Sequence, residues 1–355
     1  MKQQVLNHET SHLEEVRKDF RYLRRLTEEE QTEEICLAAI ETNGMAIKFV
    51  KNRTPELCEK AVEKEPYAIQ FIKHPDETLC LSAVQRDGKV LKLIQNATSK
   101  VCLEAVRQNG LALQYVENQT EEICLAAIKQ NGLALRYVKD KTDDICWEAI
   151  RQNGAALNFI HTPTEKMIEA AIEKDGSAIR FVKNPSQELQ IRAVQQDVTA
   201  LIYLKDVNQE VALTAILIDP YAIQYVDRPT ESLCFEAIKE EATALKYIVN
   251  RTPKLCLEAV KTDALNIFTK LDHFVRQTEE MKLEALFQNY FLINNVSKPS
   301  EEMTILAKHL EKIDFADTND YYYRRVRHLL ATKQLRLDES PYHVLDMSEG
   351  KRYSV

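Results

Sequence analysis

The sequence is poor in glycine and tryptophan, and it has no long hydrophobic run. Seven glycines and one tryptophan occur in 355 residues, and so few glycines, without strand signals, argue against an all-β protein. No run approaches the ~20 apolar residues that a membrane-spanning helix needs. The first residues, MKQQVLNHETSH, do not resemble a signal peptide. We therefore expect a cytoplasmic protein without membrane contact.

Motifs that carry enzymatic chemistry are also absent from the sequence. We find no glycine-rich phosphate loop, no nucleophile elbow and no histidine or cysteine spacing typical of a metal site. We therefore expect no cofactor, no metal and no enzymatic activity. The alternative is an enzyme whose site lies in the C-terminal segment.

A basic domain is missing as well. The net charge is -8 and the isoelectric point is near 5.7, whereas a general nucleic-acid binder usually has a strongly basic domain. Nucleic acid is therefore an unfavoured partner.

What the sequence does contain is one unit repeated many times. Its clearest copy is TEEICLAAIKQNGLALRYVKDK, residues 120–141. With Cys124 as the reference position, equivalent residues follow at intervals of 22 from Cys36 to Cys256, and two further units are centred on Lys282 and Thr304. An alanine stands three residues after the reference in all thirteen units. Such a period predicts an all-α solenoid of about thirteen helix-turn-helix repeats with helical caps.

Each repeat predicts two helices. A small polar residue four positions before the reference is a good N-cap for the first helix. These residues are Thr32, Thr54, Asp76, Thr98, Thr120, Thr142, Thr164, Ser186, Asn208, Thr230, Thr252, Thr278 and Ser300. Glycines such as Gly132 are expected to end that helix in a left-handed turn. A second, shorter helix then has Ala134, Leu135, Tyr137 and Val138 on its inner face.

All eight cysteines occupy the reference position, on the predicted buried stripe of the first helix. They are Cys36, Cys58, Cys80, Cys102, Cys124, Cys146, Cys234 and Cys256. Since their nearest equivalents lie one repeat away, we expect reduced thiols in the core rather than disulfides.

The segments AVRQNGLALQYV (105–116) and AIKQNGLALRYV (127–138) resemble a family of tandem helical repeats of unknown function, found in bacteria, phages and large viruses. The resemblance covers about residues 32–260, although the turn glycine is replaced by Pro66, Val198, Pro220 and Ala242. It implies a repeat scaffold, supplies no catalytic residues, and makes a role as a bacterial or phage effector or inhibitor plausible.

Four segments are expected along the chain. Residues 1–31 form an N-terminal helical cap and 32–261 the regular array. Four extra residues break the register in 262–310, which also holds two degenerate repeats, and 311–355 form a C-terminal helical cap and a disordered tail.

The candidate binding site is a set of apolar residues at positions where other repeats are polar. Val198, Ile202, Val207, Leu217 and Ile218 break the pattern within residues 190–226. An exposed apolar cluster often marks a protein contact, and altered local packing is the alternative. The single tryptophan, Trp147, is a further candidate contact or a large core residue. We expect a protein partner of unknown identity.

A second hypothesis uses the aromatic and basic C-terminal segment. Tyr321, Tyr322, Tyr323, Arg324, Arg325 and Arg327 could stack on bases and contact phosphates, or form a cap. This hypothesis makes the chain a nucleic-acid or nucleotide-binding protein.

Two polar rows complete the pattern. The outer position of the second helix is mostly basic or amide, from Lys48 to Arg180, and could meet an acidic partner. The residue before the turn is always an amide or an acid, from Asn43 to Asp263. Turn capping explains that row, and a ladder of ligand-binding carboxylates is the alternative.

Overall fold

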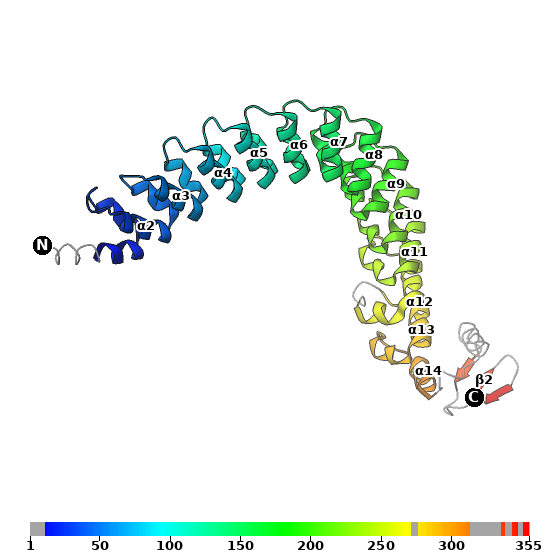
Figure 1. Cartoon of the computed structure of the whole chain (residues 1–355). Helices are drawn as coiled ribbons and strands as arrows, with labels where there is room; N and C mark the ends of the chain where they lie inside the picture. Colours follow the sequence, from blue (N-terminus) through cyan, green and yellow to red (C-terminus); the bar gives the residue numbers. More distant parts are fainter. Residues whose placement is uncertain (1–10, 271–275, 313–334, 338–342, 347–350, 355) are drawn as a thin grey trace. The chain divides into compact units, whose positions relative to one another are not determined.

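The computed structural model describes residues 11–270, 276–312, 335–337, 343–346 and 351–354. The chain divides into two compact units, Met1–Pro185 and Ser186–Val355, and both are α-solenoids (Figure 1). The predicted all-α solenoid of 22-residue repeats is therefore confirmed.

The first unit begins with helical residues 11–18 and continues through paired α-helices and 3-10 helices (η). In order they are η1 (Phe20–Arg25), α2 (Glu33–Thr42), η2 (Gly44–Phe49), α3 (Pro55–Lys64), η3 (Pro66–Phe71), α4 (Glu77–Arg86), η4 (Gly88–Leu93), α5 (Ser99–Gln108), η5 (Gly110–Tyr115), α6 (Glu121–Gln130), η6 (Gly132–Tyr137), α7 (Asp143–Gln152), η7 (Gly154–Phe159), α8 (Glu165–Lys174) and η8 (Gly176–Phe181).

The second unit continues the same alternation and then departs from it. Its elements are α9 (Gln187–Gln196), η9 (Val198–Tyr203), α10 (Gln209–Ile218), η10 (Pro220–Tyr225), α11 (Glu231–Glu240), η11 (Ala242–Tyr247), α12 (Pro253–Lys270), α13 (Glu279–Gln288), η13 (Tyr290–Asn295), α14 (Glu301–Lys312), β1 (Leu335–Leu337), β2 (His343–Asp346) and β3 (Lys351–Ser354).

Each α-helix begins where the sequence predicts. In α6, the Thr120 hydroxyl accepts a hydrogen bond from the backbone N–H of Ile123, and the predicted N-cap residue does the same in the other repeats. The buried stripe of α6 is Ile123, Cys124, Ala127 and Ile128. Within each unit, consecutive α-helices pack side by side as one layer and consecutive 3-10 helices form a second layer beneath them.

The predicted second, shorter helix is a six-residue 3-10 helix in most repeats, and in the repeat of α12 it is the α-helical end of that merged helix. Its apolar residues explain the tighter winding. Ala134 and Tyr137 are three residues apart, as are Leu135 and Val138, and three residues per turn bring each pair onto one ridge. The Val138 N–H closes the helix by donating to the Leu135 carbonyl.

The prediction that the turn glycines adopt a left-handed conformation is wrong. Asn131, before Gly132, is extended, and none of the five turn glycines from Gly44 to Gly154 has a left-handed φ. Glycine is needed there because the next repeat lies too close: a Cβ at Gly110 would be 2.3 Å from the Ala127 carbonyl oxygen. The left-handed residues lie instead in the loops between repeats: His74, Asn96, Asn184, Asp206, Arg228 and Lys298.

The register break and the C-terminus also have distinct structures. Asp263 divides α12 with a φ of -155° and a ψ of 85°, close to the extended conformation that the residue before the turn has in other repeats, such as Asn131. In the C-terminal segment, β1, β2 and β3 form an antiparallel sheet. The prediction of a helical cap and a disordered tail is therefore wrong for these residues. In β1 the sequence LRL alternates apolar and charged residues, and in β2 Val344 and Leu345 are adjacent apolar residues, patterns that suit strands.

Candidate functional site

Three aliphatic side chains of the second unit are exposed on two neighbouring helices. Ile202 is 57% exposed, Leu217 is 56% exposed and Ile218 is 52% exposed. Ile202 lies on η9 and the other two end α10, and these two helices contact each other. We call these three residues the apolar surface. Tyr203, which is 42% exposed, follows Ile202 on η9.

Repeat equivalence shows how unusual these residues are. Gln108 and Gln130 occupy the position of Ile218, and each accepts a hydrogen bond from the turn glycine N–H of the preceding repeat, at 2.7 Å. An isoleucine cannot accept that bond. The exchange leaves an aliphatic side chain where the repeats of Gln108 and Gln130 present an amide.

The other predicted contacts have a different environment. Val198 and Val207 are only half-buried and pack against the core of the second unit. Trp147 is half-buried on α7 and packs against the core of the first unit, as its core interpretation requires. The structure therefore leaves Ile202, Leu217 and Ile218 exposed on two helices that contact each other, and it packs Val198, Val207 and Trp147 against the cores.

The alternative nucleic-acid contacts cannot be placed. Tyr321, Tyr322, Tyr323, Arg324, Arg325 and Arg327 lie outside the described residues.

The sequence analysis missed three exposed apolar residues. Val249 is 88% exposed, Phe291 is 63% exposed and Leu265 is 50% exposed. Val249 could have been found, because equivalent residues such as Lys139 and Lys183 are charged. Leu265 and Phe291 follow the register break, where the repeat no longer indicates which positions face water.

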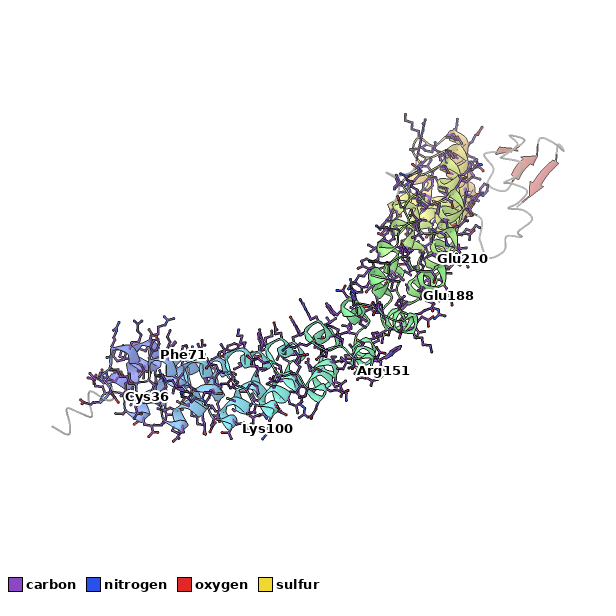
Figure 2. The ribbon with its side chains drawn as sticks, turned by 90° about the horizontal axis from the view of Figure 1, so that it is seen from above. Cys36, Phe71, Lys100, Arg151, Glu188 and Glu210 are labelled. Atoms are coloured by element: carbon purple, nitrogen blue, oxygen red, sulfur yellow. The ribbon has the colours of Figure 1, made fainter. Side chains whose placement is uncertain are left out.

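A second surface runs along the 3-10 layer of the first unit. One exposed residue of each 3-10 helix is a cation or an amide, and the next residue is aromatic in most repeats. The Lys48 amine lies 5.4 Å from the centre of the Phe71 ring, and the Arg136 guanidinium lies 5.0 Å from that of Tyr137. Figure 2 shows Phe71 on one side of this unit and Lys100 and Arg151 of the α-helical layer on the other.

The row of amides and acids before the turn is structural. Asn131 accepts a hydrogen bond from the backbone N–H of Leu133 at 3.0 Å, and Asp87 accepts one from that of Lys89 at 2.9 Å. Equivalent residues cap the other 3-10 helices in the same way, and Asp263 accepts from Asn266. Turn capping is therefore confirmed for this row.

The eight cysteines are buried and unpaired, as predicted. Burial raises the pKa of the Cys36 thiol to about 11, because the charged thiolate loses its hydration. It also raises the pKa of each of the other seven thiols. Sγ of Cys36 donates a weak hydrogen bond to the Gln31 carbonyl at 3.8 Å.

Two hollows of the first unit lie at the same place in different repeats. One of about 390 Å³ is lined by Lys51, Arg53 and Cys58, among others. Another, of about 470 Å³, lies three repeats later and is lined by the equivalent Glu117, Gln119 and Cys124. The charges of the lining residues differ, but both hollows lie at the same place in the repeat. They therefore result from the packing of successive repeats.

Two further searches of the described part of the chain gave negative findings. It contains no group of three or more His, Cys, Asp or Glu side chains arranged to hold a metal ion. None of its helices combines the length and hydrophobicity that a membrane crossing demands. Lys282, which takes the cysteine position in α13, is buried and pairs with Glu279 at 2.8 Å.

Comparison with known proteins adds one family. The family described as a domain of unknown function (DUF4116) matches residues 98–142 and 120–163. The two matches begin 22 residues apart, which is one repeat. No curated protein and no solved structure matches the chain. The central repeats are therefore similar to a tandem repeat family whose function is unknown.

Proposed function

We propose that this chain is a non-enzymatic repeat scaffold that binds a protein partner through the apolar surface of Ile202, Leu217 and Ile218. The supporting observation is that three large aliphatic side chains, each more than half exposed, lie on η9 and α10, two helices that contact each other. Covering an aliphatic side chain contributes about 1.5–3 kcal/mol when burial is complete. Three partly exposed residues would therefore form the centre of a contact rather than all of it.

The repeat explains why this surface is not needed for folding. At the position of Ile202 the next repeat has Gln224, and at the positions of Leu217 and Ile218 it has Lys239 and Glu240. A repeat can therefore fold with polar side chains at all three positions. The resemblance to repeats of bacteria, phages and large viruses favours a cytoplasmic effector or inhibitor as the biological role.

The test compares the wild-type chain with the variant Ile202→Gln, Leu217→Lys, Ile218→Gln. Each is used to capture proteins from a lysate of the native host, and a captured protein is then purified and titrated by calorimetry. We expect the variant to weaken the complex by at least about tenfold, the effect of losing roughly 1.4 kcal/mol. Its circular dichroism spectrum and melting temperature should match those of the wild type.

Val249→Lys is the matched control. It replaces the most exposed large hydrophobic residue by the type found at equivalent positions, yet it lies outside the apolar surface. Retention of the same partner, with the same affinity, by the triple variant would show that the apolar surface is not the binding site.

A further inference from the structure

The first unit carries a row of outward-facing cations and amides on its 3-10 layer. The row has one residue per repeat: Lys48, Gln70, Lys92, Gln114, Arg136, Asn158 and Arg180. All seven are exposed, cations alternate with amides, and no member is acidic. We call these residues the basic row. The whole chain has a net charge of -8, so the positive charge of this row is concentrated on one face of the first unit.

Aromatic rings hold the cations of the basic row in place. Lys48 lies over the rings of Phe49 and Phe71 at 5.9 and 5.4 Å. Arg136 likewise lies over Tyr137 and Phe159, at 5.0 and 5.9 Å. Each of these cations therefore spans its own repeat and the next. Such contacts restrict the side chains before any ligand binds.

The cations of the other layer are arranged differently. On the α-helices of the first unit, Lys60 pairs with Glu63, Arg107 with Glu104 and Arg151 with Glu148. Among the described residues, no carboxylate forms an ion pair with Lys48, Lys92 or Arg136. Several cations of the α-helical layer are thus paired within their own helices, whereas these three are left for an external anion.

We propose that the basic row binds an extended acidic segment of a protein partner. This inference rests on the proposed role as a binding scaffold, but it concerns a different unit and a different chemistry. Neighbouring helices pack about 8–10 Å apart, so cations in alternate repeats are about 16–20 Å apart. An extended peptide rises about 3.3 Å per residue. An Asp or Glu about every fifth or sixth residue would therefore meet each cation in turn.

The same geometry fits a peptide better than a nucleic acid. One strand of B-form DNA carries a phosphate about every 3.4 Å of its axis, much more closely than these cations are spaced. Phe49, Phe71, Tyr137 and Phe159 are half-buried and pack against the core. Their rings are also covered by cations, so they offer little open surface on which a base could stack.

The test uses the full chain and fluorescein-labelled poly-L-glutamate, with binding followed by fluorescence anisotropy at low salt. The row variant is Lys48→Gln, Lys92→Gln, Arg136→Gln, which introduces the residue already present at Gln70 and Gln114. The control variant, Lys100→Gln, Lys129→Gln, Lys166→Gln, removes the same charge from exposed residues of α5, α6 and α8. We expect the row variant to bind at least about tenfold more weakly, since three charge pairs of up to about 1 kcal/mol each are lost, and the control to bind like the wild type.

Three results would overturn the proposal. The first is no binding of poly-L-glutamate to the wild-type chain, and the second is equal weakening by both variants. The third is tighter binding of a labelled oligothymidylate than of poly-L-glutamate, with loss in the row variant, which would assign the row to nucleic acid. The apolar-surface variant should bind poly-L-glutamate normally. If the poly-L-glutamate experiment contradicts the basic row, the proposed function is still tested separately by the calorimetric titration of the captured protein.

Discussion

At the scale of single residues, the repeat depends on a close contact between a glycine and a carbonyl. A Cβ at Gly88, Gly110 or Gly154 would lie 2.3–2.4 Å from a carbonyl oxygen of the next α-helix. That carbonyl belongs to Ala105, Ala127 or Ala171, the alanine that recurs in every repeat. The sequence showed both residues but could not show that they meet, because they are 17 positions apart.

The first prediction concerns this contact. Gly110→Ala should lower the free energy of unfolding by about 1–3 kcal/mol, because backbone atoms must move to admit the methyl group. Urea denaturation measures the change. Gln114→Ala, an exposed substitution in the same 3-10 helix, should change stability by less than about 0.5 kcal/mol. Equal stability of the two variants would contradict the role assigned to the glycine.

The second prediction concerns alkaline pH. The pKa of Cys36 rises from 9.0 to about 11 on folding. The contribution of the neutral thiol to stability is therefore complete below about pH 9 and is lost as the pH rises through about 11. Urea denaturation at several pH values should show this loss. Cys36→Ala, which has a natural counterpart in Ala212, should reduce the pH dependence, and an unchanged slope would argue against a buried neutral thiol.

At the scale of elements, the sequence predicted α-helices better than the segments between them. Thr120 and its equivalents identify the N-terminus of each α-helix because a side-chain cap is a local interaction. The 3-10 geometry was harder to predict, since six residues such as Gly132–Tyr137 fit either helix type. The strands β1, β2 and β3 were missed because short segments pair through contacts that no local pattern reveals.

The third prediction tests a cap. Thr120→Ala should destabilise the protein by about 1 kcal/mol, because the Ile123 N–H loses its acceptor. Thr120→Asp should retain most of the stability, since Asp76 caps α4 through a 2.8 Å bond to Leu79. Thermal denaturation of the two variants measures the difference. Equal melting temperatures would show that the cap is unimportant in this array.

The candidate site was predicted with mixed success. Ile202, Leu217 and Ile218 were found because a repeat supplies its own reference for each position, and the structure confirms their exposure. Their role in binding stays a prediction. The cation contacts of Lys48 and Arg136 were missed because they join rings of two repeats, although the basic row itself was visible.

At the scale of the whole molecule, a destabilising substitution in one repeat should affect mainly that repeat and its neighbours. Within each unit, each α-helix contacts its neighbours along the chain, so the stability of a unit is roughly a sum of repeat and nearest-neighbour terms.

The fourth prediction follows from this arrangement. In Gly110→Ala, hydrogen exchange should accelerate in α5 and α6 and stay unchanged in α11. Mass spectrometry of the full chain can compare these helices, with Gln114→Ala as the control. Uniform acceleration along the chain would instead indicate a single cooperative unit.

The contact between glycine and carbonyl also limits how such a chain can change its length. In five repeats of the first unit, a turn glycine meets the alanine of the next repeat, 17 residues further along. The gain or loss of 22 residues leaves this spacing unchanged, whereas a shorter insertion must be accommodated between the two repeats. Across the four extra residues that follow Asp263, a hydrogen bond from Ala264 to Gln288 spans 24 positions, compared with 20 between Gly88 and Gln108. Arrays of this kind should therefore lengthen and shorten by whole repeats. Related chains would then offer binding faces whose lengths differ by whole repeats.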